Sequence, residues 1–254
     1  MARLAGKVAV ITGGGSGLGR AMAARFVAEG ASVLAVDVDE AGGKATLDAI
    51  GDPAHAAFRR VDVTSEDDCA ATVSEAVERW GKLDIMMANA GIGAPGFIAD
   101  LTKEDFERVM AVNLTGVFLC AKHAFRAMKG QGDGGSIIAT ASVAGLRGTP
   151  GLGGYGPSKA GVVQLVKTLA LEGARYNIRS NALCPIWTAT PMVDAFISGA
   201  RADQEAMTKR LLGDIPLGRF GAPDDVAAAA VYLASDEASF ISGVAFPIDG
   251  AAMA

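Results

Sequence analysis

The chain has 254 residues, of which half are hydrophobic and a fifth are charged, so it is long and apolar enough to bury a sizeable core. Its 23 basic and 28 acidic residues give a net charge of −5, and the absence of long basic runs argues against a nucleic-acid groove. Three widely separated cysteines argue against a disulfide framework or a zinc site, and we expect no bound metal. The first apolar run is too short for a signal peptide or membrane span, so we expect a cytoplasmic protein.

Short β-branched runs alternate with longer helical stretches from one end of the chain to the other. The runs predict strands over residues 7–12, 32–37, 56–63, 83–90, 136–141, 178–184 and 244–248. Apolar spacing and capping residues predict helices from residue 18 to a stop at Gly30, and over 40–50, 64–81, 102–128, 158–174 and 224–234. We expect Thr64 to cap the third of these helices and a break near Asn113 in the fourth.

This alternation predicts an α/β fold of the Rossmann type, a doubly wound parallel sheet of about seven strands with helices on both faces. No linker or change of composition divides residues 1–254, so we expect a single domain. The segment 188–213 falls between two strands and is too long for a plain connection. Such an insertion is typical of a lid over a binding site.

A glycine-rich turn lies between the first predicted strand and the first predicted helix. Its candidate cofactor-binding residues are Gly13, Ser16, Gly17, Leu18 and Gly19. Glycines there let main-chain N–H groups approach a pyrophosphate, and the helix N-terminus adds a partial positive charge. A flexible turn without a ligand is the alternative, but the position within a β-α-β unit favours a dinucleotide site.

Asp37 ends the second predicted strand, where a carboxylate can accept hydrogen bonds from the ribose hydroxyls of adenosine and repel a 2′-phosphate. Ser16 and Val38 occupy the positions that would normally supply a compensating cation, and neither is basic. The sequence therefore favours NAD over NADP. A solvated acid at the end of a strand is the alternative interpretation of Asp37.

Further short motifs follow in order, and together with the glycine turn they resemble the short-chain dehydrogenase/reductase family in its shorter, single-domain branch. Asp62-Val63 resembles the family's adenine-pocket pair. Asn89-Ala90-Gly91 resembles the motif that stabilises the central sheet beside the cofactor. The resemblance covers essentially the entire chain and implies that residues 1–254 form one dinucleotide-binding and catalytic domain.

Four separated polar residues, Asn113, Ser142, Tyr155 and Lys159, resemble the family's catalytic tetrad. Lys159 follows Tyr155 by four residues and so shares its helical face, where an ammonium would lower the pKa of the phenol. The resemblance implies that Tyr155 exchanges the substrate proton and Ser142 orients the substrate oxygen. It also implies that Tyr155 and Lys159 contact the cofactor, Lys159 through the nicotinamide ribose, and that Asn113 holds a water that relays the proton onward.

The segment after the sixth predicted strand departs from the family pattern, because Ile186 stands where the family has glycine. The resemblance places Pro185, Thr188 and Thr190 at the nicotinamide carboxamide. The missing glycine is expected to alter the backbone path and reshape the pocket. Ala88 and the C-terminal sequence depart in smaller ways.

The predicted lid carries apolar residues at helical spacing, with charged residues among them that include Arg201. An apolar face turned toward a pocket and a helix packed on its own core are equal alternatives for this segment. The candidate substrate contacts are Phe97, Val143, Trp187, Met192 and Phe196. They favour an uncharged, hydrophobic secondary alcohol or ketone as the small-molecule substrate.

The sequence therefore predicts an NAD-dependent oxidoreductase that interconverts a secondary alcohol and a ketone by hydride transfer, with Tyr155 as general acid and base. One alternative is an NADPH-dependent 3-oxoacyl thioester reductase, against which Asp37 and the acidic balance speak. Another is a non-catalytic NAD-binding sensor or scaffold, against which the complete tetrad speaks. The resemblance also implies a homotetramer, with the helices around 113–128 and 155–174 in one interface and the last strand and tail in another.

Overall fold

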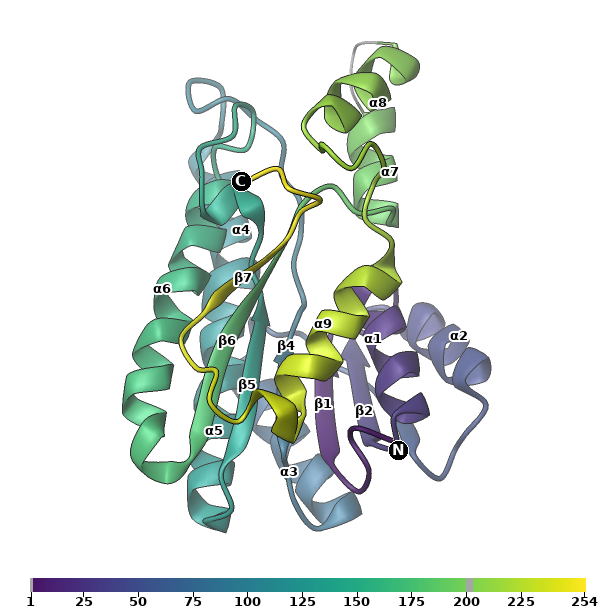
Figure 1. Ribbon diagram of the computed structural model, residues 1–254, viewed down its shortest axis with the longest axis vertical. Coiled ribbons are helices and arrows are strands. Elements are labelled where there is room, and N and C mark those ends of the chain that lie inside the picture. Colours follow the sequence, from purple (N-terminus) through teal and green to yellow (C-terminus); the bar gives the residue numbers. More distant parts are fainter. Residues whose placement is uncertain (1, 200–202) are drawn as a thin grey trace.

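A parallel sheet of seven strands forms the centre of the molecule in the computed structural model, which describes residues 2–199 and 203–254 (Figure 1). The strand order is β3-β2-β1-β4-β5-β6-β7. The strands are β1 (Val8–Thr12), β2 (Ser32–Asp37), β3 (Ala56–Arg60), β4 (Ile85–Ala88), β5 (Gly135–Thr140), β6 (Ile178–Pro185) and β7 (Ala245–Ile248). Since every neighbouring pair is parallel, the predicted Rossmann-type sheet is confirmed.

Helices cover both faces of this sheet. They are α1 (Gly17–Ala28), α2 (Glu40–Ile50), α3 (Glu66–Trp80), α4 (Lys103–Met110), α5 (Val117–Gln131), α6 (Tyr155–Gly173), α7 (Pro191–Ser198), α8 (Gln204–Gly213) and α9 (Pro223–Ala234). None of the helices in the described residues is long and apolar enough to cross a membrane. The helices α7 and α8 lie in the predicted lid, of which residues 200–202, including Arg201, are outside the described residues.

The strands alternate their side chains between two apolar layers, as the two-residue period of a strand requires. Along β1, Val8 and Val10 pack against the layer formed with α3, α5 and α6, whereas Ala9 and Ile11 pack against α1 and α9. Because both faces are covered, the central strands β1, β2 and β4 are almost entirely apolar. The continuous β-branched runs of the sequence follow from this double burial.

The order of the strands reverses at β1, which pairs with β2 on one side and β4 on the other. In an open parallel sheet, connections leave in opposite directions at such a point, and a crevice forms beyond the carboxyl ends of the strands. The glycine turn follows β1, and the Asn89 motif follows β4. The topology therefore brings the two predicted motifs together.

Two helix starts differ from the prediction. Ser65, and not Thr64, caps α3, because its hydroxyl accepts the Asp68 N–H while the Thr64 hydroxyl donates to Asp62. The helix α6 begins at Tyr155, three residues before the predicted start, because the first turn of a helix tolerates Pro157. The predicted break near Asn113 is a π-helical turn over Ala111–Gly116 between α4 and α5.

Candidate active site

The glycine turn folds back tightly on itself between β1 and α1. A Cβ atom on Gly19 would lie 1.9 Å from the carbonyl oxygen of Gly13, so no other residue fits there without moving the backbone. Gly13 itself has a φ of +68° and would place a Cβ 2.9 Å from Asn89. The turn is therefore shaped by the absence of side chains, which leaves main-chain N–H groups free to approach a ligand.

The Asp37 carboxylate lies against this turn, at the end of the neighbouring strand. Its Oδ2 accepts the Gly15 N–H at 2.9 Å, and its Oδ1 accepts the Asp39 N–H at 3.1 Å. A Cβ on Gly15 would come within 2.9 Å of the same carboxylate oxygen. Asp37 is thus fixed beside the turn, which is the arrangement that a ribose-binding carboxylate needs.

Asn89 joins the carboxyl ends of three strands. Its Nδ2 donates to the carbonyl of Thr12 at 2.9 Å, and its Oδ1 accepts the Thr140 hydroxyl at 3.0 Å. The Thr12 hydroxyl in turn accepts the N–H groups of Asn89 and Ala90, each at 2.9 Å. These bonds tie β1, β4 and β5 together directly beneath the crevice.

Asp62 and Val63 follow β3, and the first side chain is exposed whereas the second is buried. Asp62 accepts both the N–H and the hydroxyl of Thr64, and these bonds hold the pKa of its exposed carboxyl below the usual value. Val63 is buried and packs so closely on Gly116 that a Cβ there would lie 2.8 Å from a Val63 methyl group. The pair is therefore anchored against the π-helical turn that carries Asn113.

Asn113 is completely buried, and its side chain binds protein groups. Its Oδ1 accepts the Ile92 N–H at 2.8 Å, and its Nδ2 donates to the Ile92 carbonyl at 3.0 Å and the Ser158 hydroxyl at 3.2 Å. A Cβ on Gly91 would lie 3.3 Å from both Asn113 Oδ1 and Lys159 Nζ. The structure thus brings Asn113 and Lys159 to the same glycine, between the loop after β4 and α6.

Lys159 is buried, with 2% of its surface exposed, and its ammonium donates to the Thr140 carbonyl at 2.7 Å. Burial lowers the pKa of Lys159 to about 8, because no carboxylate compensates the charge. Its Nζ lies 5.6 Å from the centre of the Tyr155 ring. The ammonium that the sequence places beside the phenol is therefore present, but it loses its proton at mildly alkaline pH.

The pKa of Tyr155 is raised, not lowered, in the protein without cofactor. Burial is the main cause, and the hydrogen-bonding hydroxyl of Ser142 only partly opposes it. The expected lowering of this pKa by the Lys159 ammonium is not seen in the cofactor-free protein, where burial of the phenol sets the direction of the shift. Ser142 is held by two main-chain groups: it donates to the Pro185 carbonyl at 3.3 Å and accepts the Ala144 N–H at 3.1 Å.

The segment after β6 has an ordinary backbone despite the missing glycine. Ile186 does not adopt a positive φ, and its N–H donates to the Ile248 carbonyl at 3.2 Å. Thr188 donates its hydroxyl to the Ile186 carbonyl, and Thr190 donates to the Thr188 carbonyl. The segment therefore accommodates Ile186 without a positive φ, and Ile186 lines the pocket.

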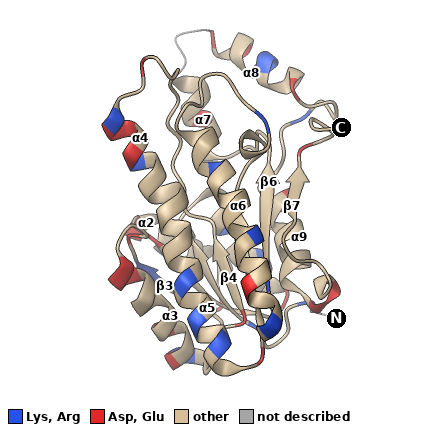
Figure 2. Ribbon diagram, turned by 90° about the vertical axis from the view of Figure 1, so that its left-hand side faces the viewer, with Lys and Arg blue, Asp and Glu red and all other residues tan. Residues whose placement is uncertain are grey.

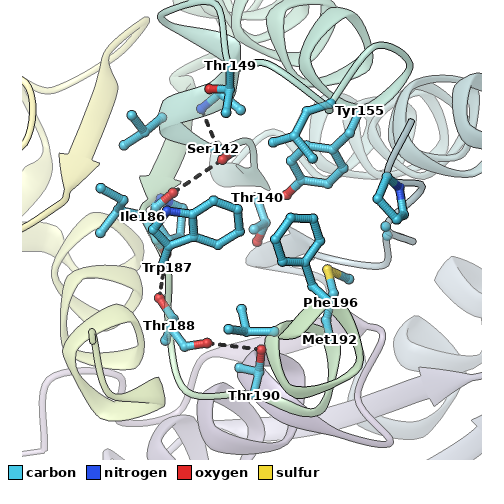
Figure 3. A pocket seen from close by; sticks show the side chains of 18 of the residues that line it. Thr140, Ser142, Thr149, Tyr155, Ile186, Trp187, Thr188, Thr190, Met192 and Phe196 are labelled. Atoms are coloured by element: carbon cyan, nitrogen blue, oxygen red, sulfur yellow. Dashed lines mark hydrogen bonds between the residues drawn. The ribbon is translucent and has the colours of Figure 1, made fainter. Parts of the chain in front are cut away.

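A cavity of about 520 Å³ lies where these elements meet. Figure 3 shows Ser142 and Tyr155 on its border, with Met192 and Phe196 of α7 facing them. Of the predicted substrate contacts, Val143, Trp187, Met192 and Phe196 line the cavity. Phe97 does not: its side chain is 64% exposed on the loop before α4, so this prediction is wrong. The four lining residues make the cavity mainly apolar.

Several residues that build the site are not among those predicted from the sequence. Thr12 and Thr140 each end a strand and bind the Asn89 motif, and a hydroxyl at the end of a buried strand was the available signal. The main chain of Ile92, which positions Asn113, gives no signal in its residue type. Arg108 and Asp214 reach the cavity from α4 and the end of α8, and only the tertiary fold brings them there.

Comparisons with known proteins agree with this geometry. A family model described as enoyl-(acyl carrier protein) reductase matches residues 13–251. The chain is 40% identical over 252 residues to a 2,5-dichloro-2,5-cyclohexadiene-1,4-diol dehydrogenase of Sphingobium indicum, covering 98% of both. It is 43% identical over 251 residues to the secoisolariciresinol dehydrogenase of Forsythia intermedia, covering 98% of this chain and 89% of that one.

A solved structure shares the fold at similar identity. The crystal structure of a 3-ketoacyl-(acyl-carrier-protein) reductase from Brucella melitensis, complexed with NADH, matches with a TM-score of 0.91 and 39% identity, covering 99% of this chain and 100% of that one. With the motifs in order at one crevice, these matches establish that the chain is an oxidoreductase and belongs to the short-chain dehydrogenase/reductase family.

Proposed function

We propose that this protein is an NAD-dependent oxidoreductase that interconverts a hydrophobic secondary alcohol and its ketone. The observation that carries the proposal is that Ser142 and Tyr155 border an apolar cavity that reaches Leu18 of the glycine turn. A substrate oxygen in this cavity would meet a hydroxyl pair, and its carbon would face the crevice at the turn. Neither a simple binding module nor a scaffold requires a buried lysine at such a place.

The residues beside the turn fit a nicotinamide dinucleotide. The tight turn that Gly13 and Gly19 permit directs main-chain N–H groups to the start of α1, which suits a pyrophosphate. The fixed Asp37 carboxylate suits the ribose hydroxyls and disfavours a 2′-phosphate. When bound, this cofactor supplies the hydride acceptor or donor. Thr188 and Thr190 line the cavity and would contact the nicotinamide end, whereas Asp62 and Val63, which follow β3, would contact the adenine.

The proton chemistry falls to Tyr155. In ketone reduction, its hydroxyl donates the proton to the substrate oxygen, and in alcohol oxidation the phenolate removes it. Ser142 holds the substrate oxygen within reach of Tyr155 because its own position is fixed by Pro185 and Ala144. Lys159 would contact the ribose of a bound cofactor, and its ammonium would favour the phenolate of Tyr155. Asn113 aligns the loop at Ile92 with α6. By the family resemblance, it would also hold the water that relays the proton onward from Lys159.

A 3-oxoacyl thioester reductase remains the second candidate, because the related Brucella melitensis enzyme carries that name and Arg108 and Arg147 border the cavity. An anionic carrier arm would suit two cations. However, Arg108 is already paired with Asp105 at 2.9 Å. The apolar walls and Asp37 favour the free alcohol or ketone with NAD.

The test is a turnover assay with secondary alcohols, their ketones and an acetoacetyl thioester, each with NAD(H) and NADP(H), followed by the absorbance of reduced cofactor. We expect turnover of alcohols and ketones with NAD(H), lost in Tyr155→Phe. The matched control is Tyr232→Phe, which removes a hydroxyl on α9 away from the cavity. Turnover confined to the thioester with NADPH would overturn the proposal in favour of the second candidate. Binding of NADH without any turnover would favour a sensor.

A further inference from the structure

Two aromatic rings form a continuous surface in the cavity. The rings of Trp187 and Phe196 are stacked, with centroids 5.2 Å apart and planes inclined by 29°. Trp187 comes from the segment after β6 and Phe196 from α7, and both line the cavity. Figure 3 shows the two rings side by side in its middle, across from the hydroxyl of Tyr155. We call this pair the aromatic wall.

Two hydrogen bonds position Trp187 in the aromatic wall. The indole N–H of Trp187 donates to Asp214 Oδ2 at 3.4 Å, at the residue that follows α8. The carbonyl of Trp187 accepts the N–H of Gly221 at 3.0 Å. A ring fixed at both its indole and its main chain gives a substrate a planar surface at a small further loss of conformational freedom.

Aliphatic side chains also line the cavity. Val143 and Leu152 are among them, one next to Ser142 in the chain and the other three residues before Tyr155. A cavity lined by such side chains and by the aromatic wall suits a planar ring, which can cover a ring face of the wall and has no rotatable bonds to immobilise. An open chain of the same carbon number loses several rotamers when it is bound there.

We propose that the aromatic wall makes the enzyme select flat, ring-bearing secondary alcohols and ketones over open-chain ones of equal carbon number. This inference rests on the proposed function and specifies its substrate class. It assigns to Trp187 and Phe196 the choice of substrate, and to Asp214 the positioning of the Trp187 ring.

The experiment compares kcat/KM for 1-indanol and 2-nonanol, which have the same number of carbons, with NAD⁺. We expect a preference for 1-indanol of about tenfold or more, which is the size of a good aromatic contact. Trp187→Leu and Phe196→Leu keep an apolar side chain but remove the flat face, so each should reduce the ratio several-fold, with a larger loss of kcat/KM for 1-indanol than for 2-nonanol. Asp214→Ala should reduce the ratio and Asp214→Asn should retain it, because an amide oxygen still accepts the indole N–H. Phe240→Leu, at a fully exposed ring, is the matched control.

An equal loss for both alcohols in the two leucine variants would show that the aromatic wall only packs α7, and an unchanged ratio would also overturn the inference. Turnover of 2-nonanol that is lost in Tyr155→Phe would uphold the proposed function even then. If no alcohol is turned over, binding decides: in a Trp80→Phe background Trp187 is the single tryptophan. Quenching of its fluorescence by 1-indanone at lower concentration than by 2-nonanone would support the aromatic wall, and equal quenching would reject it.

Discussion

At the scale of single residues, the candidate site contains one side chain that opposes folding. Lys159 is protonated at neutral pH but buried without a carboxylate partner, and its pKa falls from 10.5 to about 8. Below pH 8 both the folded and unfolded chains carry this proton, so the folded state bears the full desolvation cost. Between about pH 8 and 10.5 the unfolded chain alone keeps the proton, so stability rises with pH there.

Lys159→Met should therefore stabilise the protein at pH 7, by up to roughly 3 kcal/mol, while it abolishes turnover. Urea unfolding at pH 7 and pH 10 would measure the gain, which should shrink at the higher pH because the wild-type protein has by then lost the buried charge. Lys167→Met, at an exposed lysine of the same helix, is the control and should change stability by less than about 0.5 kcal/mol. A destabilised Lys159→Met protein would contradict the argument.

Tyrosine ionisation gives a second residue-scale prediction. The chain has three tyrosines. Burial raises the pKa of Tyr155, whereas a hydrogen bond with the neighbouring Lys129 lowers the pKa of the half-buried Tyr176. In a spectroscopic titration of the cofactor-free protein, Tyr176 should ionise first, so Tyr176→Phe should remove the earliest rise in tyrosinate absorbance. Tyr155→Phe should leave that rise intact. Loss of the earliest rise in Tyr155→Phe would mean that Lys159 alone does activate the phenol.

Asp37 allows a test of cofactor choice. Asp37→Asn keeps an oxygen for the Gly15 N–H but removes the charge that would repel a 2′-phosphate. The ratio of kcat/KM for NAD to that for NADP should fall by about tenfold or more, since one charge contact is worth on the order of 1–3 kcal/mol. Asp39→Asn, at the exposed acid two residues later, should leave the ratio unchanged. Preference for NADP in the wild-type protein would reject the role of Asp37.

At the scale of elements, the site depends on bonds between strands that lie far apart in sequence. Asn89→Ala would remove the link from β4 to Thr12 on β1 and Thr140 on β5 and leave their polar atoms partly unpaired. We expect a loss of roughly 2–3 kcal/mol in the free energy of unfolding, together with weaker NADH binding. Urea unfolding and NADH fluorescence titration would measure both. Gln164→Ala, at an exposed amide on α6, is the control, and an equal, small effect in both variants would contradict the structural role of Asn89.

The sequence was sufficient to predict all seven strands and their parallel arrangement, because strands buried on both faces are written as apolar runs. It was less informative at boundaries. Pro157 made the first turn of α6 look non-helical, so the predicted start came too late. The choice between Thr64 and Ser65 as the cap depends on which of the two hydroxyls donates to Asp62. In the cavity, residue type identified Trp187 and Phe196, but whether Phe97 pointed inward depended on a loop whose path has no sequence periodicity.

At the scale of the whole molecule, one face has the features of an interface. Figure 2 shows α5 and α6 side by side on the face turned to the viewer, with mostly Lys and Arg among their charged residues. Leu171 on α6 is 82% exposed, and Phe118 on α5 is 45% exposed. Large apolar side chains at such exposure are typical of surfaces that bury against another chain. The homotetramer that the family resemblance implies stays a prediction, and this face is the candidate for its α5 and α6 interface.

Leu171→Arg should therefore weaken the assembly, because it replaces an apolar anchor with a cation on a face that already carries several. Light scattering coupled to gel filtration should give the mass of four chains for the wild-type protein and a smaller mass for the variant at micromolar concentration. The loss should be partly reversed by salt, since screening weakens repulsion between like charges at the surface. Ile98→Arg is the matched control, because Ile98 is 81% exposed but lies on the loop before α4, near the start of α6 and far along that helix from Leu171. A monomeric wild-type protein would reject the homotetramer. A loss of mass in the control alone would place the interface elsewhere. The exposed Phe240 near β7 would then be the next position to test, because it lies beside the second predicted contact.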